Sequence, residues 1–360
     1  MEKITTNQEL EQARAADRPA LAGAALGRAL FKRTAADFVV EEDLGFEPDG
    51  DGDHLLLGIR EVGWNSASVA RWLARQFRCA PRDVGYSGHK DRHAITVQHF
   101  TIPLTKATPD PESLDWPEGL SCVRAARHRQ KLRRGAHRGN RFVIRLHDVD
   151  ADPAAVDARL QAIASRGFAN YFGSQRFGRD GANAARGRQL LESPSFRRTR
   201  GAAESIEVSA LRSELFNMVL AARVRDGTCL EVLPGDALML EGTRSFFTAD
   251  EADAGLAARV AKGDVAPTGP LWGKPDRHVS AALLARERAL LAGRTDDLQL
   301  LEARGFRMER RALRALARNL AWTWSGPGTL ELRFGLAPGN YATALIEELF
   351  WLMPALPAAG

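Results

Sequence analysis

A single carboxylate lies among cations in the segment GYSGHKDRHAITVQHFTIP, which spans residues 85–103. Asp91 follows Lys90 and precedes Arg92, and His89 and His93 stand one position further out. Neighbouring cations favour the ionised form of a carboxyl group and hold its pKa below the usual value of about 3.9. A general acid needs a raised pKa, whereas an ionised aspartate suits a nucleophile or an electrostatic partner for a cationic transition state. A salt bridge in a tight surface turn explains the same residue types, so the residues alone leave both readings open.

Other kinds of site have little support. His89 and His93 are four residues apart, as in helical zinc sites, but Gly88 and the alternating run that follows argue against a helix. An acidic third ligand with suitable spacing is missing. The sequence also contains no GxxxxGK[ST], GxGxxG or GxSxG motif, so phosphate-binding loops and a serine nucleophile elbow have no support. We therefore expect no metal and no cofactor.

Positive charge is segregated along the chain. The formal net charge is +5 and the pI is about 9.4. Residues 121–146 contain nine lysines or arginines and no acid, whereas the acids gather in EEDLGFEPDGDGD at 41–53. Segregated positive charge is expected of a protein that binds phosphates, although a solvated surface of an arginine-rich protein would look similar. The pattern favours nucleic acid as the partner.

Composition also indicates the compartment. The three cysteines are far apart, the N-terminal residues lack the apolar core of a secretion signal, and no apolar run is long enough to span a membrane. We expect a cytoplasmic protein with no membrane association.

The elements that must position Asp91 can be read from the periodicity of apolar residues. Strands are predicted at 54–62, 94–102, 141–146 and 329–334. Helices are predicted at 66–77, 153–166, 209–225, 251–262, 280–292, 308–321 and 340–352. Asn65 or Ser66 is expected to cap the first of these helices, and Asp152 the second. Strands dominate the first part and return near residue 330, which predicts an α+β domain interrupted by a helical one.

Three motifs occur together and in order: GHKDRHAITVQHF around Asp91, RGNRFVIRL at 138–146, and NYFGSQRFG at 170–178. Further stretches of the same kind are DFVVEEDLGFEPDGDGDH, SALRSELFN, GDALML and RFGLAPGNYATALIEEL. The ordered set resembles the tRNA pseudouridine synthase D family, which makes pseudouridine at position 13 of certain tRNAs. The resemblance runs from about Ala25 to Leu349, nearly the whole chain.

The resemblance implies a pseudouridine-synthase-type fold, with a mostly antiparallel sheet and helices, interrupted by a family-specific domain rich in helices. The implied catalytic domain is discontinuous and comprises residues 25–166 and 315–352. The inserted domain would span 167–314, and residues 1–24 would form an N-terminal segment.

The resemblance also assigns site residues. It implies that Asp91 is catalytic, and that Phe38, Asn140, Phe142 and Tyr341 contact the substrate. Family members more often have phenylalanine where Tyr341 stands. Asparagine offers a donor and an acceptor to a uracil edge, and a phenylalanine ring offers a stacking face. For any single phenylalanine, packing in the core is the more common explanation.

The expected function is therefore isomerisation of uridine to pseudouridine in tRNA, at position 13, with one ionised aspartate and a flipped-out uridine. tRNA is the expected partner; we expect a monomer with no protein partner. The alternative is a non-catalytic RNA-binding or chaperone protein that retains the fold, although binding alone would not require Asp91. The sequence leaves open which tRNAs are modified, whether position 13 is the only target, whether the route is covalent or through a glycal, and which cation pairs with Asp91; Lys32 is one candidate.

Overall fold

The computed structural model describes residues 18–88, 90, 93–106, 108–178, 180–196 and 205–354. The chain forms two compact units. The sheet unit comprises Gly27–Ala151, Ala317–Gly339 and the described residues from Leu352 onward. The second unit, named the α5 unit after its helix α5 (Ile206–Arg225), comprises Asp152–Leu316, Asn340–Trp351 and the described residues up to Leu26. The domain borders implied by the family resemblance remain a prediction.

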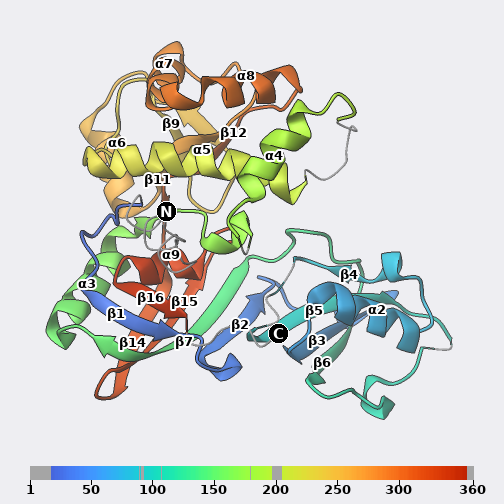
Figure 1. Cartoon of the computed structure of the whole chain (residues 1–360). Helices are drawn as coiled ribbons and strands as arrows, with labels where there is room; N and C mark the ends of the chain where they lie inside the picture. Colours follow the sequence, from blue (N-terminus) through green and yellow to red (C-terminus); the bar gives the residue numbers. More distant parts are fainter. Residues whose placement is uncertain are drawn as a thin grey trace, which may run out of the picture. The chain divides into compact units, whose positions relative to one another are not determined.

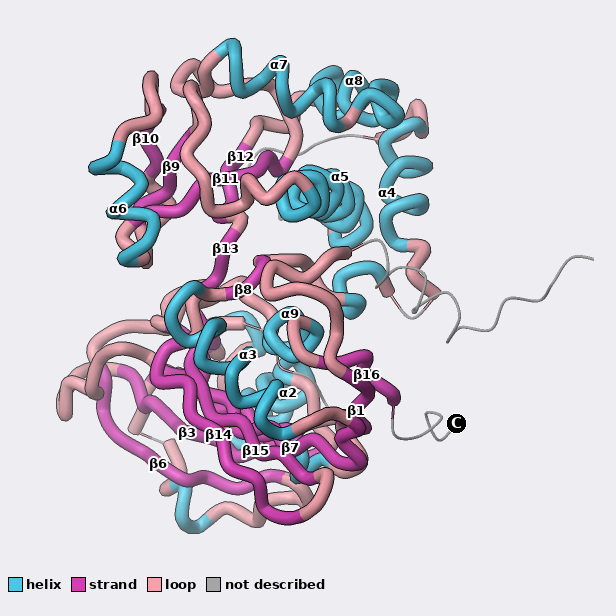
Figure 2. The backbone as a smooth tube through the Cα atoms, turned by 90° about the vertical axis from the view of Figure 1, so that its left-hand side faces the viewer, coloured by secondary structure: helices cyan, strands magenta, loops and turns pink. Residues whose placement is uncertain are grey.

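In the described part of the chain, ten strands form one large sheet, which Figure 2 shows in magenta. Most neighbouring strands run antiparallel, whereas β2 (Phe38–Asp43) and β5 (Ile95–Pro103) pair in parallel. The main order of the sheet is β14 (Arg318–Gly326), β15 (Thr329–Leu336), β7 (Gly139–Asp150), β2 (Phe38–Asp43), β5 (Ile95–Pro103), β3 (His54–Val62) and β6 (Leu120–His128). The strands attached to this order are β1 (Gly27–Phe31), β4 (Gly85–Tyr86) and β16 (Phe350–Pro354). The predicted α+β fold with a mostly antiparallel sheet is confirmed.

Helix α2 (Ser66–Gln76) covers one face of this sheet. It begins where predicted, because the Asn65 side chain accepts a hydrogen bond from the backbone N–H three residues later, at 2.9 Å. Its apolar residues recur at helical spacing, and Val69 and Leu73 are fully buried. They belong to one cluster with the inward side chains of β3 and β5, Leu57, Ile59, Phe100 and Ile102. The polar cap and the apolar stripe together fix where α2 starts and which face it buries.

The α5 unit is built around α5 (Ile206–Arg225), a 20-residue helix with buried residues along its length. Figure 1 shows α5 in yellow beside α4 in green, and α7 and α8 in orange. The other helices of the unit are α3 (Pro153–Arg166), α4 (Asn183–Glu192), α6 (Ala254–Lys262), α7 (Ala281–Leu290), α8 (Thr295–Ala303) and α9 (Ala342–Glu347). The unit also has strands: β10 (Phe246–Thr248), β9 (Ala237–Leu240), β11 (Val265–Leu271) and β12 (Glu309–Ala312) form one sheet, and β13 (Arg314–Ala315) pairs with β8 (Phe168–Ala169). This region therefore combines helices with a sheet that the sequence did not predict.

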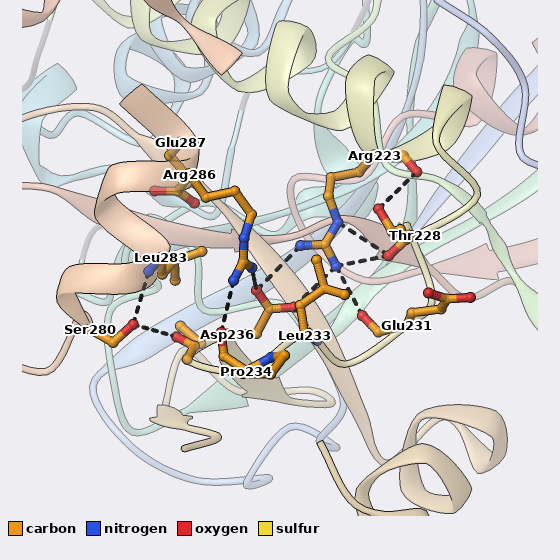
Figure 3. A network of polar contacts seen from close by, with 12 residues as sticks. Arg223, Thr228, Glu231, Leu233, Pro234, Asp236, Ser280, Leu283, Arg286 and Glu287 are labelled. Carbon is orange, nitrogen blue, oxygen red and sulfur yellow. Dashed lines mark hydrogen bonds and ion pairs between the residues drawn. The ribbon is translucent and has the colours of Figure 1, made fainter. Parts of the chain in front are cut away.

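A buried network of charges connects the loop after α5 with α7. The side chain of Asp236 is 2% exposed; it lies 3.1 Å from the guanidinium of Arg223 and 2.7 Å from that of Arg286. Arg223 also donates to the carbonyls of Thr228 and Glu231, at 2.8 and 2.9 Å. Figure 3 shows the carboxylate of Asp236 between the two guanidinium groups. Because the buried charges have partners, the network holds the loop in place.

The helix predicted at 308–321 is wrong, because this stretch forms β12, β13 and the start of β14. Its alanine, leucine and arginine content favours a helix locally. Two arginines instead make tertiary contacts: Arg310 donates to the carboxylate of Glu287 at 2.9 and 2.6 Å, and Arg314 donates to the carbonyl of Val265 at 3.1 Å. Strand pairing and these buried contacts override the local preference.

The helix predicted at 340–352 is too long. Helix α9 ends after six residues, and the chain then enters β16. Just after α9, the carboxylate of Glu348 accepts hydrogen bonds from the backbone N–H groups of Leu21, Ala22 and Ala169, at 3.1, 2.8 and 2.8 Å. This buried anchor turns the chain away from the helical path.

Candidate functional site

The residue predicted to be catalytic, Asp91, lies outside the described residues, as do His89 and Arg92. The chain just before it is held to the sheet unit, because the side chain of Gln98 in β5 donates to the carbonyl of Gly88 at 2.6 Å. Gly88, three residues before Asp91, is thus held against the central strand β5.

Lys90 holds the same segment at a second point. Its backbone N–H donates to the hydroxyl of Ser66, the first residue of α2, at 2.9 Å. Its ammonium group donates to Oδ1 of Asn140 and lies 3.5 Å from Oε1 of Glu42. The lysine and glutamate side chains are 7% and 0% exposed. Lys90 therefore links the segment that carries Asp91 to a predicted substrate-binding residue.

These groups belong to a polar row on one face of the sheet. Glu42 in β2 stands directly opposite Asn140 in β7. Further along, Glu61 in β3 stands opposite Thr96 in β5. Residues directly opposite in a sheet place their side chains on the same face. The row lies on the face that α2 covers, since Ile59, two residues before Glu61, packs in the α2 cluster.

The acids of this row differ in charge. Burial alone would raise the pKa of Glu42, but a hydrogen bond from His99 and the charge of Lys90 outweigh it and hold the pKa below its usual value. The backbone N–H of His99 donates to Oε2 of Glu42 at 3.0 Å. Burial raises the pKa of Glu61 to about 8, with Glu42 adding to the shift and Lys90 opposing it. At neutral pH Glu42 is therefore ionised and Glu61 is mostly protonated.

Burial also affects the cations. It lowers the pKa of Lys90, while the nearby Glu42 works in the opposite direction. Burial likewise lowers the pKa of His137, whose neighbours Glu42 and Lys90 act in opposite directions. The cluster thus joins the carboxylate of Glu42 to the amine of Lys90, beside the mostly protonated acid Glu61.

Two predicted substrate contacts, Phe38 and Phe142, are in contact with each other: their ring centroids are 6.1 Å apart. They are 7% and 8% exposed. The ring of Phe142 is stacked on that of Phe334 with a 5.4 Å centroid distance, and Lys32 lies 4.1 Å from the centroid of Phe38. The structure thus brings Phe38, Asn140 and Phe142 together on one face, where the two rings also pack in an aromatic cluster.

Asn140 is placed by the start of β7. This strand begins at Gly139, so Asn140 and Phe142 are both strand residues and share a face. A Cβ atom at Gly139 would lie 2.4 Å from the carbonyl oxygen of Leu336 in β15, a contact that real side chains do not make. The glycine therefore allows β7 and β15 to approach closely beside Asn140.

The fourth predicted contact, Tyr341, belongs to the α5 unit, at the residue that precedes α9. Its ring meets that of Phe172 edge-on, with centroids 5.8 Å apart. The guanidinium of Arg311 lies 4.1 Å from the centroid of the same Phe172 ring, and that of Arg176 lies 5.2 Å from it. Tyr341 therefore stands beside an aromatic ring that carries two arginines.

The described parts of the chain contain no group of three or more His, Cys, Asp or Glu side chains placed to hold a metal ion. Among the described helices, none has both the length and the apolar character that crossing a membrane requires.

Sequence reasoning missed the contribution of Glu42 and Glu61. The signal was present in the alternation of both strands: Phe38, Val40 and Glu42 share one phase of β2, and Glu61 continues the inward phase of β3. An acid at an inward position of an otherwise apolar strand indicates a buried carboxyl group with a specific role.

Comparison with known proteins identifies the same family as the sequence motifs, and the match extends over nearly the whole chain. The family model for tRNA pseudouridine synthase D (TruD) matches residues 26–195 and 192–349. A protein of Xanthomonas campestris pv. campestris named tRNA pseudouridine synthase D is 45% identical over 345 residues, covering 92% of this chain and 94% of its own. A protein of the same name from Methylococcus capsulatus is 41% identical, with the same coverage.

A solved structure is also similar. The crystal structure of a putative tRNA pseudouridine synthase D from Methanosarcina mazei superimposes with a TM-score of 0.66 and covers 91% of this chain and 94% of its own. At 18% sequence identity, this similarity concerns the fold.

Proposed function

Because the chain belongs to the tRNA pseudouridine synthase D family, we propose that it isomerises uridine to pseudouridine in tRNA. In this reaction the N1–C1′ bond of the uridine breaks and a C5–C1′ bond forms. The C5 hydrogen leaves as a proton and N1 gains one, so substrate and product have the same composition. The reaction needs no oxidant and no added group, and we propose that the protein uses no cofactor and no metal.

We assign Asp91 as the catalytic residue, acting on the sugar or the base as nucleophile or base. The observation that carries the assignment is the anchoring of its neighbours: Lys90 reaches Asn140, and Gln98 holds Gly88. The segment that carries Asp91 is thus tied to the face where Asn140 and Phe142 lie. A catalytic carboxylate must be held within a small distance of its target, and the contacts of these two neighbours support the assignment.

The target base must leave the stacked RNA before a side chain can reach C1′ or C5. We propose that Phe38, Asn140, Phe142 and Tyr341 receive the flipped uridine, and that the target is position 13. The acid-free segment 121–146 supplies cations for the tRNA backbone. We further propose that residues 167–314 are the inserted family-specific domain, and that the protein acts as a monomer in the cytoplasm.

The test uses unmodified tRNA and three proteins: wild type, Asp91→Asn, and the matched control Asp83→Asn, which alters an aspartate of the same region. No metal or cofactor is added, and a chelator is present. We expect pseudouridine at position 13 with wild type and the control. Asp91→Asn should bind tRNA with similar affinity and form no product.

Wild type that binds tRNA but leaves every uridine unchanged would contradict the proposed activity and favour a non-catalytic RNA-binding protein. Product at another position would contradict only the proposed target. An active Asp91→Asn protein would show that this carboxylate is not the catalytic group.

A further inference from the structure

We propose that Lys90 fixes the amide of Asn140 so that this residue recognises the target base as a hydrogen-bond donor to a uracil carbonyl oxygen. The inference rests on the proposed function, and it makes Lys90 a positioning residue and Asn140 a determinant of base recognition.

The orientation of the amide follows from the chemistry of its partner. An ammonium group has three donors and no acceptor. Its contact with the amide of Asn140 must therefore involve Oδ1, which is the atom it reaches. The NH2 group is then directed away from Lys90, and within the described residues it makes no hydrogen bond. Asn140 is half-buried, so as far as the described residues show, its donor is available to a ligand on the same face.

Lys90 is itself held in place. Its backbone is bound to Ser66, and its ammonium group lies between Asn140 and the buried carboxylate of Glu42. Glu42 in turn accepts the backbone N–H of His99. Rotating the ammonium group away from this buried carboxylate would separate two charges in a region shielded from water. The amide of Asn140 therefore has one stable orientation, before any substrate binds.

The fixed donor of Asn140 selects uracil over cytosine when it faces O4. Uracil presents acceptors at O2 and O4 and a donor at N3, whereas cytosine carries an amino group in place of O4. A donor facing O4 would meet another donor in cytosine, which leaves a buried polar group unpaired. A donor facing O2 would not separate the two bases. Donation to O4 would therefore distinguish uracil from cytosine, and donation to O2 would not. Replacing each oxygen by sulfur identifies the one that Asn140 contacts.

The experiment uses tRNA in which the target uridine is replaced by 2-thiouridine or by 4-thiouridine, since sulfur is a weaker acceptor than oxygen. Isomerised nucleosides are separated chromatographically after digestion of the tRNA. For wild type we expect one of the two analogues to lower kcat/KM by roughly 3- to 10-fold, the loss of one neutral hydrogen bond. The position of the sensitive sulfur names the oxygen that Asn140 contacts.

The informative variant is Asn140→Asp, which keeps an oxygen for Lys90 and removes the donor. It should lower kcat/KM for uridine by roughly 10- to 100-fold. The sensitive analogue should then cost it nothing further, because the contact is already lost. Asn319→Asp, at an exposed asparagine of the same unit, is the matched control and should keep both the activity and the analogue effect of wild type.

The role of Lys90 is tested in the double variant Lys90→Met, Glu42→Gln, which removes both charges and leaves no buried carboxylate unpaired. It should bind tRNA, turn over more slowly, and show a smaller analogue effect than wild type because the amide can rotate. An unaltered analogue effect in a folded double variant would overturn the role of Lys90. Equal analogue effects in wild type and Asn140→Asp would overturn the role of Asn140. Failure of wild type to isomerise uridine would instead overturn the proposed function.

Discussion

Glu61→Gln should make the stability of the sheet unit less sensitive to pH. Glu61 is 1% exposed, and burial raises the pKa of its carboxyl to about 8, from 4.5. Between these values the folded protein binds a proton that the unfolded chain releases. Stability therefore falls as the pH rises through this window, and the loss is complete above the folded pKa. Glutamine keeps the shape of the protonated acid and cannot ionise.

The size of the effect follows from the same two values. The contribution of Glu61 disfavours folding by about 2 kcal/mol at pH 6 and by about 4 kcal/mol at pH 8. We therefore expect the stability difference between Glu61→Gln and wild type to grow by about 2 kcal/mol between pH 6 and pH 8.

Hydrogen exchange of the amides in β3 and β5 measures this difference within the sheet unit, because comparing two proteins at one pH cancels the intrinsic exchange rate. The matched control is Glu41→Gln, at an exposed glutamate of β2, which should show no such trend. A stability difference that stays constant from pH 6 to pH 8 would mean that Glu61 is ionised in the folded protein, and the account of the buried cluster would be wrong.

Three further outcomes are expected. Asp236→Asn should destabilise the protein by about 3–5 kcal/mol in urea unfolding, because it leaves Arg223 buried without its counter-charge. The control Asp226→Asn, at an exposed aspartate, should change stability little. Gly139→Ala should lower both stability and kcat, since the new methyl group would force β7 away from β15 next to Asn140; Gly293→Ala, with no heavy atom within 4 Å of the added carbon, is the control. Arg133→Ala should reduce the slope of log K against log salt concentration for tRNA binding by about 1, because this exposed side chain is expected to contact a phosphate. Arg138→Ala should reduce the slope less, because Arg138 already pairs with Asp43 at 2.7 Å. Equal slopes for wild type and Arg133→Ala would contradict the contact.

The elements nearest the site could be predicted from the sequence because local and tertiary signals agree there. Asn65 supplies a cap, Val69 and Leu73 supply a helical stripe, and the structure has α2 where these features indicate. The strand at 54–62 has the same bounds in the structure. Elsewhere the signals conflict. Arg310 sits in a locally helical sequence, but its partner Glu287 lies 23 residues earlier in the chain, so only the fold reveals that it belongs to a strand.

The candidate site was predictable in its residue types and less so in its geometry. The strand predicted at 141–146 begins two residues earlier, at Gly139, so Asn140 lies in β7 and shares a face with Phe142. The contact between Lys90 and Asn140 joins residues 50 positions apart, and no periodicity reports it. The aromatic packing of Phe142 on Phe334 likewise depends on the pairing of β7 with β15. Motifs identify side chains, whereas strand pairing decides which of them meet.

The buried cluster around Lys90 is difficult to explain as a source of stability. Neighbouring positions on the same face carry Leu57, Ile59 and Phe100, which are completely buried, and apolar side chains in place of a buried ion pair often stabilise a fold. The protein also keeps Glu61 next to this pair, in a place where its carboxyl stays largely protonated at neutral pH. Such an arrangement disfavours folding, yet it holds one ammonium group in a fixed position beside Asn140. A cluster that lowers stability and fixes a recognition group is expected where geometry is needed for function. By this argument, neutralising the cluster should make the sheet unit more stable and the enzyme less selective. A neutralised variant that kept the selectivity of wild type and gained no stability would contradict it.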